Sequence, residues 1–199
     1  MNNMAAKLMD TKGLKTGSLA GHLLIATPVV QESCFARSVI YMCAHNEAGA
    51  MGMIINYPVE SIDIKEIFSQ LAIDGNPLGR KFPIHFGGPV ESNRGFVLHS
   101  DEYATEGSLI RQDGIAVTAS VSVLKELAQG SGPAQGMLVL GYAGWSPGQL
   151  ESEIETGSWI VVPASKQLIF DTDNETKWNV AVSSLGFDMG HYSTVVGHA

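Results

Sequence analysis

The run Val39-Ile40-Tyr41-Met42-Cys43-Ala44 decides how the rest of this 199-residue chain has to be arranged. It is an unbroken apolar run of strand length, so we expect a strand over residues 38–44. Successive side chains of a strand point to opposite faces of the sheet, and here both faces are apolar. Such a strand has to be covered on both sides, either by a layer of helices or by closure of the sheet into a barrel.

Other short apolar runs, bounded by turn residues, predict further strands. They lie at residues 22–26, 51–56, 84–86, 95–99, 115–118, 137–141, 159–162 and 168–170. Capping residues and helical spacing predict about four helices. These begin at Ser61, at Ser120, after Trp145 and at Thr172, and the last carries Trp178, Val182 and Leu185 and ends at Gly186. Strands outnumber helices without regular alternation, which favours an α+β fold with a mixed sheet.

Composition indicates a globular protein of one domain. Hydrophobic residues make up 45% of the chain and charged residues 16%, which is an ordinary globular mixture. Residues 1–18 are polar, and we expect a flexible N-terminal arm there. From residue 19 to residue 199 no linker, repeat or low-complexity tract interrupts the sequence, so we expect a single domain over 19–199.

Charge and hydropathy restrict the partners and the compartment. Twelve Lys and Arg face twenty Asp and Glu, which gives a net charge of −8 and disfavours contact with phosphate backbones. The first residues lack the apolar core of a signal peptide, and no segment reaches the ~20 apolar residues that span a bilayer. We therefore expect a cytoplasmic protein without a membrane partner, for which direct DNA binding is disfavoured.

Five blocks of sequence occur in a recognisable order. They are residues 21–28, 35–46, 49–56, 86–90 and 141–151, followed by Trp159 and the Lys177-Trp178 pair. In this order they resemble the bacterial YqgE/AlgH family over nearly all of residues 19–186. The resemblance implies a branched, twisted β-sheet, partly closed into a small barrel, with helices around it. It supplies no catalytic residues to carry over, and one branch of the family is labelled a transcriptional regulator.

The segment Gly144-Trp145-Ser146-Pro147-Gly148 matches the G-x-S-x-G pattern of a hydrolase nucleophile elbow. The residue after the nucleophile normally donates its N–H to the oxyanion, but Pro147 has none, and one lost donor costs about 3–4 kcal/mol. A structural interpretation explains the same residues, with Ser146 as N-cap, Pro147 at N1 and Gln149 closing a capping box. The other residues of the hydrolase hypothesis would be His85, Asp171 or Asp188, and His191 or His198.

Metal and cofactor sites are not predicted. The six histidines show no H-E-x-x-H or other close pair, and Cys34 and Cys43 form no ligand motif. Asp171 begins a segment similar to a calcium loop, but Thr176 and Val182 stand where that loop needs Gly and Glu. A polar cluster at residues 99–103 follows a predicted strand without a spacing that demands a reaction.

One candidate groove remains, because two glycines and a proline after a strand mark a fixed turn that aromatic side chains can border. Its residues are Gly87, Gly88, Pro89, Tyr142, Gly144 and Trp145. Core packing explains the aromatic residues equally well. The leading hypothesis is a non-enzymatic binding or regulatory module that acts through a protein or small-molecule partner. A hydrolase that uses the segment from Gly141 to Gly148 and a transcriptional regulator are the alternatives.

We expect no useful binding of duplex DNA at physiological salt, because the chain is acidic and has no Lys/Arg run. Specific DNA-binding proteins reach dissociation constants of about 10⁻⁸–10⁻¹¹ M under such conditions. Fluorescence anisotropy with a pool of genomic fragments checks this expectation. A salt-dependent complex at sub-micromolar protein concentration would contradict it.

Overall fold

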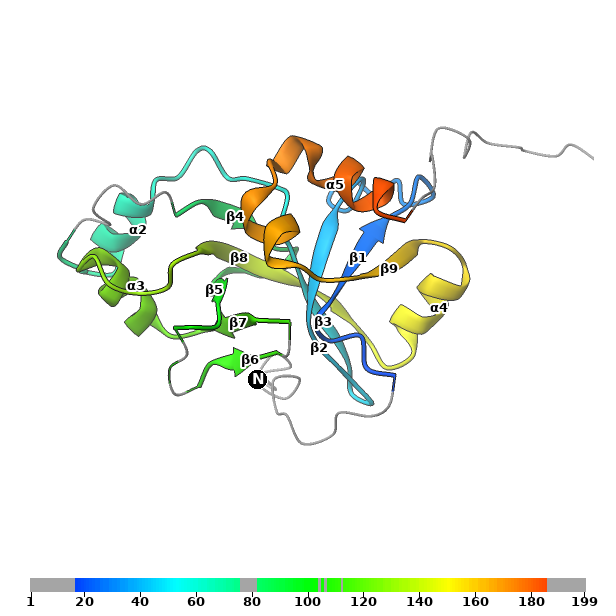
Figure 1. Ribbon diagram of the computed structural model, residues 1–199, viewed down its shortest axis with the longest axis horizontal. Helices are drawn as coiled ribbons and strands as arrows, with labels where there is room; N and C mark the ends of the chain where they lie inside the picture. Colours follow the sequence, from blue (N-terminus) through cyan, green and yellow to red (C-terminus); the bar gives the residue numbers. More distant parts are fainter. Residues whose placement is uncertain (1–16, 76–81, 104, 106, 112, 186–199) are drawn as a thin grey trace, which may run out of the picture.

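The computed structural model describes residues 17–75, 82–103, 105, 107–111 and 113–185 (Figure 1). Most of the expected N-terminal arm lies outside these residues, as do Gly186, Asp188, His191 and His198. The described residues form nine strands that belong to one curled sheet. The strands are β1 (His22–Ala26), β2 (Val39–Asn46), β3 (Gly49–Ile54), β4 (Ile84–Phe86), β5 (Val90–Ser100), β6 (Leu109–Ile110), β7 (Ile115–Thr118), β8 (Gly136–Trp145) and β9 (Trp159–Pro163).

The sheet branches at β8, a strand of ten residues. The order of paired strands is β6-β7-β5-β8-β3-β2-β1-β9, and β4 pairs with β8 off this path. The first half of β8 lies between β5 and β4, and its last residues pair with β3. The β4–β8 pairing is parallel and the others are antiparallel, so the sheet is mixed. The curled sheet forms a half-barrel, which confirms the expected α+β fold and its branched sheet.

Five helical segments lie around the sheet within the described residues. They are α2 (Ile64–Gln70), α3 (Val121–Ala128), α4 (Gln149–Glu155), the π-helix η1 (Gln167–Asp171) and α5 (Asn174–Ser183). Helices α2 and α3 pack with β4 at one end of the molecule, α4 packs against β3 and β9 at the other, and α5 lies near β1 and β2 (Figure 1). Ser120 caps α3 as expected, whereas Asp63 rather than Ser61 caps α2.

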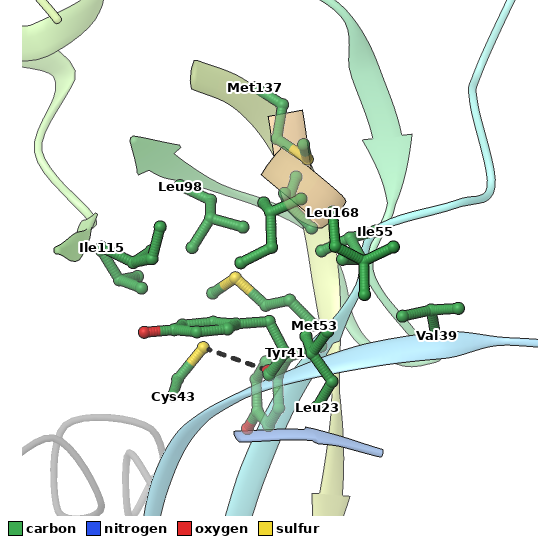
Figure 2. Close-up of a cluster of buried hydrophobic side chains, with 14 of the residues drawn as sticks. Leu23, Val39, Tyr41, Cys43, Met53, Ile55, Leu98, Ile115, Met137 and Leu168 are labelled. Carbon is green, nitrogen blue, oxygen red and sulfur yellow. Dashed lines mark hydrogen bonds between the residues drawn. The ribbon is translucent and has the colours of Figure 1, made fainter. Parts of the chain in front are cut away.

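Both faces of β2 are buried, as its sequence requires. Val39, Tyr41 and Cys43 belong to the core inside the half-barrel, which Figure 2 shows together with Leu168 of η1. Ile40 and Met42 point to a second core. Leu150 of α4 and the side chains of Phe35, Trp145 and Trp159 also pack in this second core. One face of β2 is therefore covered mainly by closure of the sheet, and the other by a helix and an aromatic cluster.

The predicted strand at residues 168–170 is wrong, because these residues lie in η1. Three apolar residues are too few for periodicity to separate a strand from a helical turn. Leu168 and Ile169 are buried against the half-barrel core, and the hydroxyl of Ser165 accepts from the N–H of Leu168 at 3.2 Å. The two-residue strand β6 was not predicted by the sequence pattern, since it is shorter than the runs that the pattern detects.

The predicted cap at Ser146 is also wrong. Helix α4 begins directly after its N-cap residue Gly148, whose φ of 76° is left-handed. No side chain caps the helix. Half of the capping box is present, since the backbone N–H of Ser146 donates to Oε1 of Gln149 at 3.0 Å. At the last helix the N-cap is Asp173 rather than Thr172, whose hydroxyl donates to the carbonyl of Gln167 instead.

Gly88 lies where the chain between β4 and β5 crosses β8. Its φ is 147°, and a Cβ at this position would overlap the backbone of Tyr142 and Ala143. Gly148 also has a positive φ, but a Cβ there would meet no atom within 4 Å. Substitution of each glycine by alanine therefore distinguishes the free-energy cost of backbone strain, which both variants share, from that of a steric clash, which only Gly88→Ala has.

We expect Gly88→Ala to destabilise the protein by about 2–4 kcal/mol, because overpacking adds to the strain of a left-handed residue. The matched control Gly148→Ala should cost only about 1 kcal/mol, from strain alone. Urea unfolding followed by circular dichroism measures both. Equal losses of stability in the two variants would show that the crossing at β8 accommodates a methyl group.

Candidate functional site

The structure divides the six residues of the predicted groove between different surroundings. Gly87 and Gly88 are buried at the crossing with β8, and Pro89 is exposed beside them. The hydroxyl of Tyr142 donates to Oε1 of Glu91 at 3.2 Å. Gly144 and Trp145 line a separate pocket of about 440 Å³, which the other four residues do not line. A single groove through all six residues therefore stays a prediction.

Ser146 is exposed on the loop between β8 and α4. Among the described residues, no hydrogen bond joins its hydroxyl to a histidine or a carboxylate. Of the other residues in the hydrolase hypothesis, Asp171 accepts a hydrogen bond from Gln135 at 2.6 Å, and His85 lines a different hollow. A serine nucleophile needs a base within hydrogen-bond reach, and the described residues supply none to Ser146.

The larger hollow has a volume of about 900 Å³ and lies where β4 leaves the branched sheet. Its walls come from the segment before α2 and the start of α2, from β4, from the start of β8, from η1 and from α5. The apolar part of the lining includes Ile64, Phe82, Ile84, Met137, Ile169 and Phe170. The polar part includes Glu60, Asp63, Lys65, His85, Thr172, Asp173, Asn174 and Lys177.

Lys177 is the most unusual residue of this hollow, because only 2% of its surface is exposed. Its ammonium nitrogen donates to the backbone carbonyls of Ile55 at 3.0 Å and Ile169 at 2.8 Å, and to Oδ1 of Asn174 at 3.2 Å. Among the described residues, no carboxylate forms an ion pair with it. Burial lowers the pKa of Lys177 to about 8, and the nearby charge of Asp173 opposes this shift.

His85 lies beside Lys177 and is 1% exposed. Oδ1 of Asn174 accepts from Lys177, so the 3.2 Å contact between that oxygen and Nε2 of His85 requires a proton on Nε2. Nδ1 is then unprotonated, and it has no hydrogen-bond partner among the described residues. Burial lowers the pKa of His85 to about 4; the bond to Asn174 opposes this effect and the charge of Lys177 adds to it.

The side chains of Lys177, His85 and Asn174 together hold a fixed positive charge and do not form a nucleophile. Three oxygen acceptors surround the Lys177 nitrogen, and this number matches the three N–H bonds of an ammonium group. A neutral amine would leave one of these oxygens without a donor. The arrangement therefore holds, at the hollow, an ammonium without an ion-pair partner among the described residues, with a neutral imidazole next to it.

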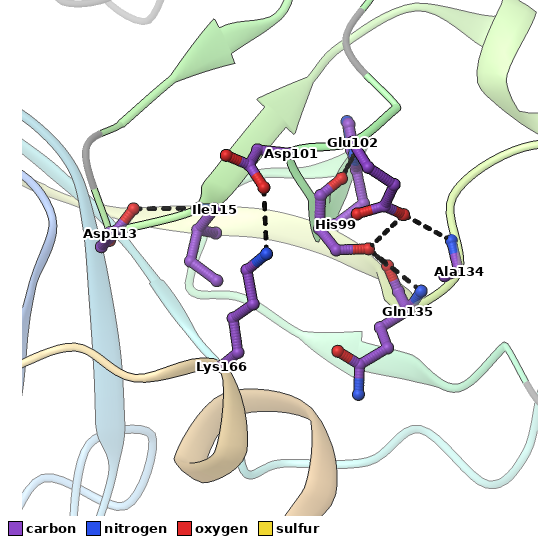
Figure 3. Close-up of polar contacts among 9 residues, drawn as sticks. His99, Asp101, Glu102, Asp113, Ile115, Ala134, Gln135 and Lys166 are labelled. Atoms are coloured by element: carbon purple, nitrogen blue, oxygen red, sulfur yellow. Dashed lines mark hydrogen bonds and ion pairs between the residues drawn. The ribbon is translucent and has the colours of Figure 1, made fainter.

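The polar cluster predicted at residues 99–103 is hydrogen-bonded to Ala134 and Gln135, which line the large hollow (Figure 3). Nδ1 of His99 contacts the carbonyl of Ser100 at 2.9 Å, so it carries the proton, and Nε2 accepts from the hydroxyl of Thr118 at 2.8 Å. Glu102 accepts from Ser100 at 2.7 Å and from the backbone N–H of Ala134 at 2.8 Å. These bonds fix the Ala134 edge of the hollow.

Sequence reasoning did not select Lys177 as a functional residue. The available signal was its spacing, since it lies one turn before Ala181, and both side chains are buried in α5. A lysine on the buried face of a helix needs oxygen partners. The partners Ile55 and Ile169 are backbone carbonyls far apart in the sequence, so no local pattern could indicate them.

The described residues contain no group of three or more His, Cys, Asp or Glu side chains that could hold a metal ion. Within the same residues, no helix has the length and apolar character needed to cross a membrane.

Comparison with known proteins places this fold and this sequence in one family. The sequence profile of the AlgH-like family matches residues 23–190. Similar chains include a UPF0301 protein of Afipia carboxidovorans, 49% identical over 92% of this chain and 91% of its own. A UPF0301 protein of Agrobacterium fabrum is 45% identical over 96% of this chain and 98% of its own. The chain belongs to the AlgH-like family of bacterial proteins, also designated UPF0301.

Two solved structures have the same fold. The solution structure of the AlgH protein from Pseudomonas aeruginosa has a TM-score of 0.74 at 35% identity and covers 95% of this chain and 100% of its own. The crystal structure of a protein from Corynebacterium diphtheriae has a TM-score of 0.70 at 20% identity, with 94% and 97% coverage. The first agrees with the family assignment, and the second shows the fold alone.

The lowered pKa of His85 predicts a loss of stability in acid. Because the folded pKa is about 4 and the ordinary value is 6.5, the unfolded chain binds the extra proton between these two values. Stability should therefore fall as the pH falls through this window, by up to about 1.4 kcal/mol per pH unit from this group. His85→Gln removes the titrating group, and urea unfolding between pH 4 and 7 should show a shallower slope. An unchanged slope would assign the acid sensitivity to other groups, of which His99, whose pKa burial also lowers, is one.

Proposed function

We propose that this protein is a non-enzymatic binding or regulatory module that acts in the cytoplasm by holding a small molecule in the large hollow. The observation that supports this most strongly is the hollow of about 900 Å³ with the buried Lys177 and His85 and the half-buried Asn174 together beside it. Ligand sites in proteins have volumes of about 300–1,000 Å³, and they combine apolar walls with a few convergent polar groups. Strongly shifted pKa values cluster at such sites.

Binding fits the chemistry of the hollow better than catalysis does. The lone pair of Lys177 is unavailable while its nitrogen donates to three oxygens. Nε2 of His85 donates its proton to a hydrogen bond with Asn174, and Nδ1 of His85 is buried away from solvent. These groups fix an electrostatic environment, and they offer no pair of nucleophile and base.

The lining defines the class of ligand that we propose. Ile64, Phe82 and Ile84 offer apolar surface to an organic skeleton. The ammonium of Lys177 has no ion-pair partner among the described residues, and its positive charge favours an acidic or carbonyl oxygen in the hollow. Glu60, Asp63 and Asp173 also line the hollow and disfavour a ligand with several negative charges. The proposed ligand is therefore a small organic acid or carbonyl compound with at most one negative charge.

A thermal-shift screen with a library of small organic acids and carbonyl compounds tests this function. A ligand at about 100 times its dissociation constant stabilises the native state by about 2.7 kcal/mol, so binders should raise the melting temperature. Ala134 is exposed and lines the hollow, so Ala134→Trp should fill it and abolish the shift.

Ala119→Trp is the matched control, because Ala119 is also exposed but does not line the hollow. Compounds that stabilise the wild-type protein should stabilise this control to the same extent. A library without any stabilising compound, or compounds that still stabilise Ala134→Trp, would refute the large hollow as the binding site.

A further inference from the structure

The smaller pocket, of about 440 Å³, shares no lining residue with the large hollow. It lies at the opposite branch of the sheet, between the loop that follows β1, the end of β8, α4 and the start of β9. Its lining contains three large aromatic side chains, Phe35, Trp145 and Trp159, and two glutamates, Glu32 and Glu153, but no basic residue.

The three aromatic rings form a connected group. The rings of Trp145 and Trp159 lie at 83° to each other with centroids 6.0 Å apart, and Phe35 meets Trp159 at 85° and 6.1 Å. Both contacts are edge-to-face. All three rings also line the pocket, and the face of an aromatic ring attracts a cation because it carries partial negative charge.

The carboxylate of Glu153 is held at this aromatic group. Its Oε2 accepts from the indole N–H of Trp145 at 2.8 Å and from that of Trp159 at 2.7 Å. Its Oε1 accepts from the side-chain amide of Gln149 at 2.9 Å. All three donors are neutral, and no described basic residue forms an ion pair with Glu153. The negative charge is thus fixed in place but is not compensated within the pocket.

From this arrangement we propose that the pocket binds an organic ammonium group, such as the trimethylammonium head of a small molecule. The aromatic rings supply attraction to a cation, and Glu153 supplies the opposite charge at short range. Glu32 at the same pocket and the net charge of −8 act in the same direction. An anionic ligand is disfavoured for the same reasons, so this pocket differs in ligand class from the large hollow.

Titration of the full chain with choline, followed by NMR of the indole N–H groups, tests the proposal. The resonances of Trp145 and Trp159 should shift, whereas that of Trp178 should not, because its indole donates to the carbonyl of Ala26 outside the pocket. The neutral isostere 3,3-dimethyl-1-butanol has the same shape without the charge. Choline should bind about tenfold more tightly than the isostere.

Two matched variants on α4 isolate the charge. Glu153→Gln should reduce choline affinity about tenfold, whereas Glu155→Gln, an exposed residue that does not line the pocket, should leave it unchanged. Phe35→Leu should reduce it by about 2- to 5-fold through loss of one ring. If Glu153→Gln does not fold, the comparison of choline with its isostere on the wild-type chain decides.

Equal binding of choline and the isostere, or no shift of either indole resonance, would overturn the proposal. Equal choline affinities in Glu153→Gln and Glu155→Gln would overturn it as well.

Discussion

Both faces of β2 have to be kept from water, and the chain does this with two different structures. Curling of the sheet encloses Val39, Tyr41 and Cys43 inside a half-barrel. A half-barrel leaves its convex face open, so Ile40 and Met42 need a separate cover. Helix α4 and the aromatic cluster supply it. Two cores on opposite faces of one strand are the consequence, and the small pocket lies within the cover of the second core.

The open side of the half-barrel needs closing too, and this explains the position of α5 and η1. Ile169 and Ala181 are buried in the half-barrel core, and they bring Lys177 with them into the interior. Its ammonium group binds the carbonyl of Ile169 in the π-helix and that of Ile55 beyond β3. π-Helices are rare, and those that occur are often found at functional sites. Here the carbonyl of Ile169 helps to hold a charge next to a ligand-sized hollow.

The branch at β8 is what creates room for two pockets. One end of β8 pairs with β4 and β5, and the other end pairs with β3. Because β4 leaves the main path of the sheet, a gap opens between it, α2 and α5, and the large hollow lies there. The crossing itself depends on Gly88, whose backbone lies against that of Tyr142. The two pockets thus follow from the same topological feature, yet the charge held at the large hollow is the ammonium of Lys177 and the charge held at the small pocket is the carboxylate of Glu153.

Local sequence signals determined most of the strands, the cap at Ser120 and the burial of both faces of β2, because these depend on periodicity and on side chains close in the chain. They failed at residues 168–170, because a three-residue apolar run fits either a strand or a helical turn. They also failed at Ser146, because the left-handed Gly148 is the N-cap of α4 instead. Tertiary structure alone decided the two sites. Lys177 meets the carbonyl of Ile55 across 122 positions, and both indoles meet Glu153 only once β8, α4 and β9 are packed. Backbone carbonyls carry no residue identity, so no sequence pattern can report that they converge.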